Sequence, residues 1–419
     1  MTDSIDPRRA QLRIIFLIVF LYLVGFGVII PMIPLLARDF GASAFQVGLL
    51  MSVYSGVQFI FSPFWGRLSD RKGRKPILLF CLLGEGLSYL LFAFSRSLEM
   101  LFLSRILAGF FAGSISTAAA YISDITPPKE RSKGMALIGA AFGLGFLIGP
   151  ALGGFLTTWG QTFSSEKHFG TGFAGIFVSI FCLIIFILGL KYLTESLHLR
   201  AKHHIEPALE KRQNRLLVLF KYVGRPLLGP MIIVYLLSSF AMSTMEATLI
   251  LFLGDRYQWG IREVSYGFAY VGLISVFCQG YLVRKLLPVV GERRMMVFGL
   301  LVLGLSIAAI PFVPSLAGLA VVMTCLGVGN SFTNPSVLGS ISLLSGAEEQ
   351  GLVLGIAQSA ASLGRILGPA LGGILYQHFT QSSPFLSGGF IALLGFLITT
   401  FLFAQLPETA KKQSAGAGA

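Results

Sequence analysis

The chain has 419 residues, of which 54% are hydrophobic and only 12% are charged. The charged fraction is about half that of an average soluble protein, and the mean hydropathy of +0.78 leaves too little polar surface for a soluble globular enzyme. The composition also excludes a disordered chain, a disulfide scaffold and a collagen repeat, and it favours a helical protein whose solvent is mostly lipid.

Twelve apolar runs are long enough to cross a bilayer, which takes about 20 residues. Gly and Pro within these runs do not exclude helices, because bundled membrane helices tolerate both. The first run is too long for the core of a signal peptide. The predicted spans are residues 12–37, 46–68, 75–95, 98–122, 133–157, 171–193, 227–253, 263–285, 293–312, 315–341, 349–376 and 383–405.

The basic residues predict the orientation of these spans. If the N-terminus is cytoplasmic, most of the 32 Lys and Arg residues fall in cytoplasmic segments, and few fall outside. This bias follows the positive-inside rule, so we expect a protein of the inner membrane with both termini in the cytoplasm. It also explains the net charge of +13 by topology and anionic lipid, without a nucleic-acid partner. The basic residues left outside are Arg38, Arg96, Lys167, Arg256 and Arg262.

The segment from Gly66 to Lys75, between spans two and three, is a basic cytoplasmic turn. Its glycines predict a tight turn and close helix approach. We expect Asp70 to meet the N-terminal end of a neighbouring helix, where the helix dipole favours an anion. The arginines of the segment are expected to pair with acids at the inside ends of other spans, such as Asp124.

Span five carries six glycines between Gly139 and Gly154, with Pro150 as a predicted bend. Small residues let helices touch backbone to backbone. Simple packing is one interpretation of this stripe. The other is an interface that seals or hinges two halves of the protein.

A polar segment at residues 194–225 divides the chain into two sets of six spans. GPALGG occurs at Gly149–Gly154 and again at Gly368–Gly373, and at the same offset of 219 positions Glu130 aligns with Glu349. We therefore expect an all-α membrane protein with two pseudo-symmetric six-helix halves around a central site. The predicted domains are residues 1–193, a cytoplasmic linker at 194–225, residues 226–405, and a cytoplasmic tail at 406–419.

Four charged residues lie well inside spans, away from their ends, and an intramembrane charge is a functional candidate because it is costly to bury. Glu246 in span seven and Arg365 in span eleven are at similar depth, so we expect them to pair. Glu85 and Arg105 are a looser analogue in the first half. All four are candidates for proton coupling, although each acid has the alternative role of hydrogen-bonding helices together.

Polar side chains on several spans are candidates to line a central cavity or to join helices. They are Tyr22, Tyr54, Gln58, Ser88, Asn330, Asn334 and Gln358. The sequence contains no Walker loop, no Ser/His/Asp constellation and no zinc spacing. We therefore expect no catalytic residue, no metal and no cofactor, and a proton gradient as the energy source in place of ATP.

These motifs together resemble the major facilitator superfamily over essentially the whole chain. Residues 66–75 match its loop pattern G-x-L-x-D-R-x-G-R-K, residues 103–109 resemble its span-four motif, and residues 139–154 resemble the span-five motif of proton-driven antiporters. The resemblance implies a cytoplasmic gate and an antiporter hinge. The gate candidates are Gly66, Asp70, Arg71, Gly73, Arg74 and Asp124, and the hinge candidates are Gly145, Gly149, Pro150, Gly153 and Gly154.

Within that family, residues 25–34 and 88–94 look like the first and third spans of tetracycline/proton antiporters. The acid expected in span one is replaced by Tyr22, the acid expected in span three is replaced by Ser88, and span nine has no acid. Tetracycline is therefore a poor candidate substrate.

Three functions remain open. The first is a proton-coupled exporter of small, partly apolar compounds, acting as a monomer by alternating access. The second is a metabolite or lipid-like amphiphile carrier of unknown direction. The third is a non-transporting membrane receptor. The sequence argues against it, because we predict no signalling domain.

Overall fold

A computed structural model describes residues 7–126, 131–164, 166, 168–196, 221–346 and 349–406. Of residues 7–9, 131–136, 139, 140, 142 and 146 it describes only the helical backbone. Glu130, one member of the predicted pair of equivalent acids, lies outside these ranges. The described residues form helices and no strands.

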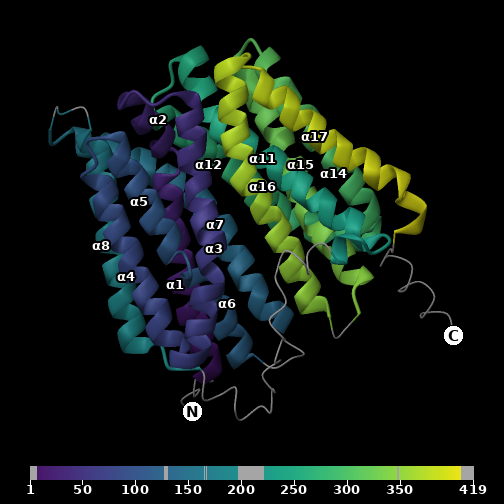
Figure 1. The fold of residues 1–419 in the computed structure, drawn as a ribbon, viewed down its shortest axis with the longest axis horizontal. Coiled ribbons are helices and arrows are strands. Elements are labelled where there is room, and N and C mark those ends of the chain that lie inside the picture. Colours follow the sequence, from purple (N-terminus) through teal and green to yellow (C-terminus); the bar gives the residue numbers. More distant parts are fainter. Residues whose placement is uncertain are drawn as a thin grey trace. The chain divides into compact units, whose positions relative to one another are not determined.

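The described residues of the first predicted half form eight helices (Figure 1). Two predicted spans are each divided into two helices, the first by Pro31, which lacks a backbone N–H, and the fourth at Ala112 and Gly113. The helices are α1 (Pro7–Ile29), α2 (Met32–Asp39), α3 (Ala44–Lys72), α4 (Arg74–Ala93), α5 (Leu98–Phe111), α6 (Ser114–Ile125), α7 (Arg131–Gln161) and α8 (Phe169–Tyr192).

The second predicted half follows the same order of long helices. The eighth predicted span of the chain is not a continuous α-helix, because a π-helical turn at Cys278–Val283 interrupts it. The remaining helices are α11 (Leu228–Tyr257), α12 (Ile261–Phe277), α13 (Arg284–Val290), α14 (Glu292–Ala309), α15 (Leu316–Leu344), α16 (Gln350–His378) and α17 (Ser383–Phe401), with short 3₁₀ turns at Ile310–Phe312 and Phe403–Gln405.

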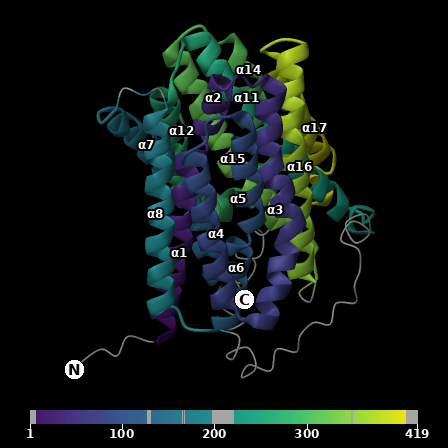
Figure 2. The same cartoon turned by 60° about the vertical axis from the view of Figure 1, so that its left-hand side comes forward.

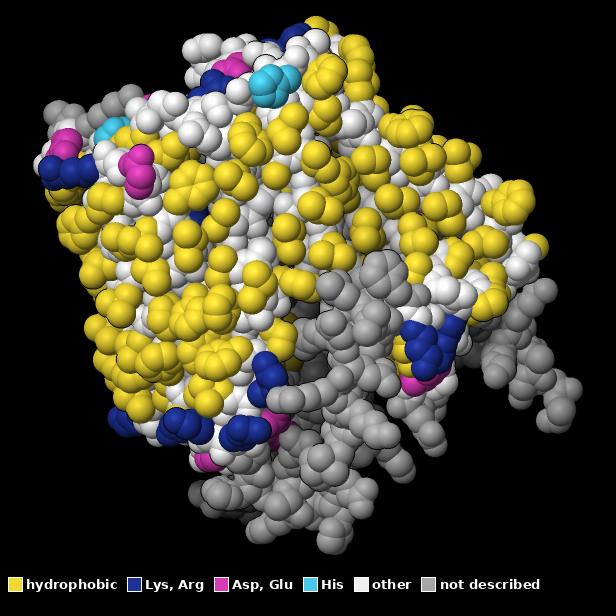
Figure 3. Space-filling view, in the orientation of Figure 1, with side chains coloured by type: hydrophobic (Ala, Val, Ile, Leu, Met, Phe, Trp, Pro, Cys, Tyr) yellow, Lys and Arg dark blue, Asp and Glu magenta, His cyan; other side chains and the backbone are white. Residues whose placement is uncertain are grey.

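Eleven stretches within the described residues are long and apolar enough to cross a membrane, and each coincides with a predicted span. The twelfth predicted span is α7, which includes residues without described side chains. Hydrophobic side chains cover the middle of the visible helices, whereas charged side chains gather towards the helix ends (Figure 3). This pattern is that of helices whose middle faces lipid.

Contacts divide the chain into two units. Unit 1 comprises Met1–Ala42, Val53–Leu209 and Leu253–Gly272, and unit 2 comprises Ser43–Ser52, Glu210–Phe252 and Leu273–Ala419. In unit 1, α1, α4 and α8 run side by side (Figure 2) and share a core with α6. In unit 2, residues of α11, α14, α15 and α16 share a second core.

Matching helix starts recur in the two predicted halves. Ser97 and Ser315 begin α5 and α15, and the hydroxyl of each accepts a hydrogen bond from a backbone N–H three residues later. Gly73 and Gly291 precede α4 and α14 with nearly the same backbone angles, φ 107° and 85°. These matching helix starts agree with the internal sequence repeat, because equivalent helices of the two halves begin with the same kind of residue.

Candidate functional site

A buried cluster of polar groups surrounds Glu85 in unit 1. Tyr22 of α1 donates a hydrogen bond to Oε1 of Glu85 at 2.7 Å, and both side chains are buried. Arg105 of α5 is also buried, and its charge acts on Glu85. The Arg105 guanidinium lies over the ring of Tyr54, 5.2 Å from its centroid, and so makes a cation–π contact. The structure thus brings the predicted pair Glu85 and Arg105 into one cluster.

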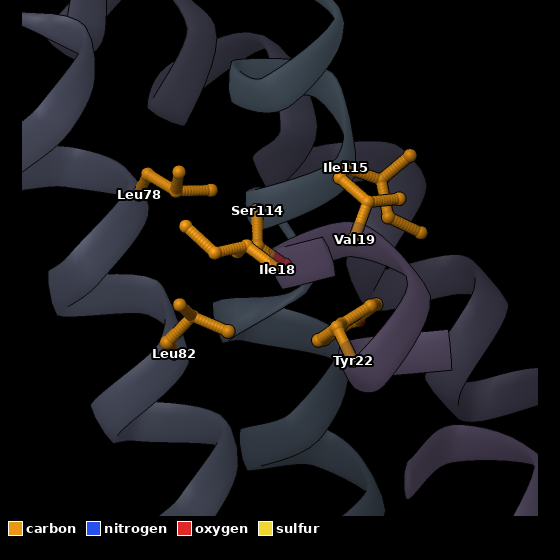
Figure 4. A pocket seen from close by; sticks show the side chains of 7 residues that line it. All are labelled: Ile18, Val19, Tyr22, Leu78, Leu82, Ser114 and Ile115. Atoms are coloured by element: carbon orange, nitrogen blue, oxygen red, sulfur yellow. The ribbon is translucent and has the colours of Figure 1, made fainter. Parts of the chain in front are cut away.

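Small residues on α4 explain why Glu85 is enclosed. A Cβ atom at Gly86 would lie 3.2 Å from the Cβ of Cys182, so the glycine lets α8 approach α4 closely. A gap between α1, α4 and α6 is lined mostly by apolar side chains and has no room for a water molecule (Figure 4). Its lining residues are Ile18, Val19, Tyr22, Leu78, Leu82, Ser114 and Ile115.

Two residues predicted to line a cavity are enclosed in this structure. The Tyr22 side chain is only 2% exposed, and its hydroxyl donates a hydrogen bond to Glu85. The Ser88 hydroxyl donates to the carbonyl of Gly84, one turn earlier on α4. Both hydroxyls are buried, and a buried hydroxyl needs a hydrogen-bond partner, which each finds inside unit 1. Gln58 is partly exposed, whereas Tyr54 is buried under Arg105.

In unit 2, α11 and α16 pack closely and in parallel. Cβ atoms at Gly364 and Gly368 would lie 2.8 Å from the nitrogen and 2.9 Å from the oxygen of Phe240, respectively. The hydroxyl of Thr244 donates to the Gly368 carbonyl at 3.2 Å. Gly372, one turn further along α16, faces Thr248, one turn further along α11. The contacts fix the register of the two helices.

The same two helices carry a polar face in unit 2. Gln358 Nε2 donates to the hydroxyl of Tyr235 at 3.1 Å, and Arg365 Nη2 donates to Ser362 Oγ at 2.8 Å. Gln358 and Arg365 are exposed, and Glu246 is partly exposed.

The Arg365 charge acts on Glu246 across this face. The register places Arg365 level with Phe240, so Glu246 lies about six residues, or roughly 9 Å, further along the bundle. An extended Arg side chain spans most of that distance. On α15, Asn334 Nδ2 donates to Asn330 Oδ1 at 3.1 Å, so these two candidates bond to each other.

An ion-pair network lies at the end of unit 1 where α3 ends. The buried Arg74 side chain pairs with Asp70 at 2.5 Å and with Asp124 at 3.0 Å, and Nη1 donates to Ser69 Oγ at 2.7 Å. The Arg74–Asp124 pair is one that the sequence predicts. Asp124 also accepts a hydrogen bond from the hydroxyl of Ser196.

The two glycines of this segment differ from the expectation that both serve the turn. Gly73 has φ 107°, a left-handed conformation that only glycine adopts without strain, and it is the turn. Gly66 lies inside α3, and a Cβ there would have no heavy atom within 4 Å. The predicted close approach at Gly66 is therefore not found among the described residues. Arg71 is exposed.

The span-five glycines pack α7 against α1. A Cβ at Gly149 would lie 2.7 Å from the Cα of Gly27, and Gly145 and Gly153 meet α1 in the same way. Pro150 lies within α7, which is helical from Arg131 to Gln161. Gly154 faces α12 instead, because a Cβ atom there would lie 2.8 Å from the Cβ of Ser265 in the same unit.

The repeated motif in α16 makes the corresponding contacts in unit 2. Gly368 and Gly372 face α11, while a Cβ at Gly373 would lie 3.0 Å from the Cα of Phe45. In each copy of GPALGG the first glycines pack against a long helix, α1 or α11. The last glycine packs against the start of another helix, α12 or α3. The geometry is what backbone-to-backbone packing requires.

Comparison with known proteins gives these features a family. The model of the Major Facilitator Superfamily matches residues 15–290 and 285–419. The chain is 28% identical to the class B tetracycline resistance protein of Escherichia coli, covering 97% of this chain and 99% of that protein. It is 30% identical to multidrug resistance protein 2 of Bacillus subtilis, covering 95% and 96%.

Solved structures agree with this assignment. The human organic anion transporter MFSD10 matches with a TM-score of 0.70 and 28% identity, covering 94% of this chain and all of that one. A bacterial homologue of the lysosomal transporter Spinster shares the fold, with a TM-score of 0.73 and 16% identity. The matched family consists of transporters, which are not enzymes. The chain is therefore a multi-span membrane transporter that belongs to the major facilitator superfamily.

Proposed function

We propose that this transporter exports small, partly apolar compounds in exchange for protons, by alternating access. The names of its relatives, which include tetracycline and multidrug resistance proteins, support export of such compounds. The observation that carries the proposal is the polar face of unit 2, where Glu246 on α11 lies within electrostatic reach of Arg365 on α16. Glu85 with Arg105 is the second candidate for the same role.

Exchange requires that proton and substrate compete for one place. A carboxylate binds a proton more readily when it is buried and less readily beside a guanidinium. If Glu246 alternates between pairing with Arg365 and facing the substrate, its proton occupancy changes with the state of the transporter. The same carboxylate then serves both the proton and the substrate, which is the condition for coupling.

The charge of the substrate decides the sign of this coupling. A cationic group pairs with Glu246 only after the proton has left, so a cation moves against the proton. The expected cargo is therefore a compound with a basic group and an apolar body. Tyr235 and Gln358, one end of the same polar face, offer a hydroxyl and an amide to its polar groups.

A carrier of organic anions is the second candidate. Its support is the exposed Arg365, together with the similarity to a human protein described as an organic anion transporter. An anion binds Arg365 best when Glu246 is protonated and no longer attracts the guanidinium. Such a substrate travels with the proton, so the two candidates predict opposite signs of coupling.

The network around Arg74 is proposed as the cytoplasmic gate, with both termini in the cytoplasm and the protein in the inner membrane as a monomer. The glycine contacts of α7 and α16 are proposed as the opposing seal. Alternating access then opens one end of the transporter while the other end is closed. Small-molecule substrate, protons and the lipid bilayer are the partners that this mechanism needs.

The test uses proteoliposomes with an imposed pH gradient and an internal pH indicator. Ethidium, tetracycline and norfloxacin serve as probes with basic groups, and 5-carboxyfluorescein serves as the anion. The proposal predicts that at least one basic probe releases protons from acid-loaded vesicles. Co-movement of protons with the carboxylate probe alone would establish the anion carrier instead.

The Glu246→Gln variant decides the residue. It should abolish proton release while still allowing downhill movement of the probe, because the amide cannot titrate. Glu263→Gln, at the exposed start of α12, is the matched control and should behave as wild type. Normal pumping by Glu246→Gln would exclude Glu246 and leave Glu85 as the coupling acid.

A further inference from the structure

The first turn of α4 has an unusual cap. The first four backbone N–H groups of a helix have no partner within it. Here Gly73 donates to the carbonyl of Ser69 at 3.2 Å, and Pro76 has no N–H to satisfy. The two remaining groups, on Arg74 and Lys75, donate to Oε1 and Oε2 of Glu195 at 2.8 and 3.1 Å. One carboxylate, 121 positions away from Arg74, completes the cap.

The geometry of this cap is specific. A Cβ at Gly73 would lie 2.5 Å from Oε2 of Glu195, so the glycine makes room for the carboxylate. A negative group at a helix N-terminus is also favoured by the helix dipole. Glu195 lies just after the end of α8, in the first residues of the segment that joins the two sets of spans.

Neighbours of Glu195 bind two further helices. We name residues 194–196 the linker clasp. The Thr194 N–H donates to Oε1 of Gln11 on α1 at 3.1 Å. The Thr194 carbonyl accepts from Tyr121 on α6 at 2.9 Å. Ser196 donates to Asp124 on α6 at 3.2 Å. Three consecutive residues thus contact α1, α4 and α6.

We propose that Glu195 is a positioning residue of the gate, acting through Arg74. Glu195 accepts a hydrogen bond from the backbone N–H of Arg74. The side chain of the same arginine reaches Asp70 and Asp124. Removing the carboxylate loosens the start of α4 and with it both ion pairs. The functional part rests on the proposed gate role of Arg74, whereas the structural part does not depend on transport.

Hydrogen exchange of the full-length protein in lipid nanodiscs tests the structural part. Glu195→Ala should speed amide exchange at the start of α4 about fivefold, the usual effect of losing a helix cap. Exchange at the end of α6 around Asp124 should also rise, because Arg74 loses its position. Glu195→Gln should be intermediate, since its single amide oxygen can accept one of the two bonds. Should Glu195→Ala not fold, Glu195→Gln decides the question.

Two control variants make the result specific. Glu99→Gln removes a charge from the exposed first turn of α5 and should change neither segment. Ser196→Ala removes the bond between the clasp and Asp124, and Glu195→Ala should still speed exchange around Asp124 in that background. Faster exchange confined to α4 would overturn the proposal, because Glu195 would then cap one helix and position nothing.

Transport gives the functional readout. With any probe that the transporter moves, Glu195→Ala should lower the maximal rate about fivefold at unchanged KM, and should lower it no further when combined with Asp124→Asn. Independent, multiplicative losses in the double variant would overturn action through Arg74. Because hydrogen exchange needs no substrate, failure of this proposal and failure of the proposed function are distinguishable.

Discussion

Tyr22→Phe removes one hydroxyl from an enclosed polar contact of unit 1. The lost bond is 2.7 Å long, both partners are buried, and no water fits in the adjacent gap. A buried acceptor that loses its donor costs about 1–3 kcal/mol. The variant should therefore lower the free energy of unfolding by that amount, while the ring remains in place and the packing of α1 is unchanged.

The assay is reversible unfolding in mixed detergent micelles, with Tyr281→Phe as the control for an exposed hydroxyl. The decisive measurement repeats Tyr22→Phe in a Glu85→Leu background, where the hydroxyl has no carboxylate to bind. There the substitution should change the unfolding free energy by less than about 0.5 kcal/mol. An equal loss in both backgrounds would refute the inferred bond between Tyr22 and Glu85.

Three further outcomes follow from the packing and the charges. Gly149→Val should destabilise the protein by about 1–3 kcal/mol or prevent folding, because its Cβ meets the backbone of α1, whereas Gly56→Val, with no heavy atom near its Cβ position, should be tolerated in the same unfolding assay. The pKa of Glu349 is lowered, chiefly because Arg225 donates a hydrogen bond to it, so wild type should be more stable than Glu349→Gln at pH 7 and lose that advantage as the pH falls below about 4 in thermal unfolding. Asp70→Asn should reduce vesicle transport at normal expression by weakening the gate, and a wild-type rate would count against the gate role.

The spans were predictable because a bilayer imposes a length and an apolar composition on each one. The breaks at Pro31 and Gly113 were not, since bundled helices accommodate Pro and Gly in many positions without ending. The Arg74–Asp124 pair was predictable from charge alone, because both residues lie at the same end of their spans. Gly66 was misjudged, since a glycine in a motif does not reveal whether a neighbour approaches it.

Contacts that depend on the rotation of helices escaped prediction. Tyr22 was expected to line a cavity, but its side chain faces Glu85, and no periodicity in α1 marks that direction. Glu195 was read as part of a polar linker, since a cap supplied from 121 positions away leaves no local pattern. One signal was available: the sequence from Gly73 to Pro76 offers no capping side chain of its own, so a helix starting there needs a partner from elsewhere.

The two intramembrane acids differ in exposure, and this difference favours Glu246 over Glu85 for the proposed coupling role. Glu85 is enclosed, hydrogen-bonded to Tyr22, and beside a buried cation. A group so enclosed is costly to expose, and a proton can reach it only if the helices around it separate. Glu246 is partly exposed and interacts with an exposed cation across a polar face. In the proposed mechanism a coupling carboxylate exchanges both its proton and its partner in every cycle, and the partly exposed Glu246 can do so with less disturbance of the core of its unit than the buried Glu85.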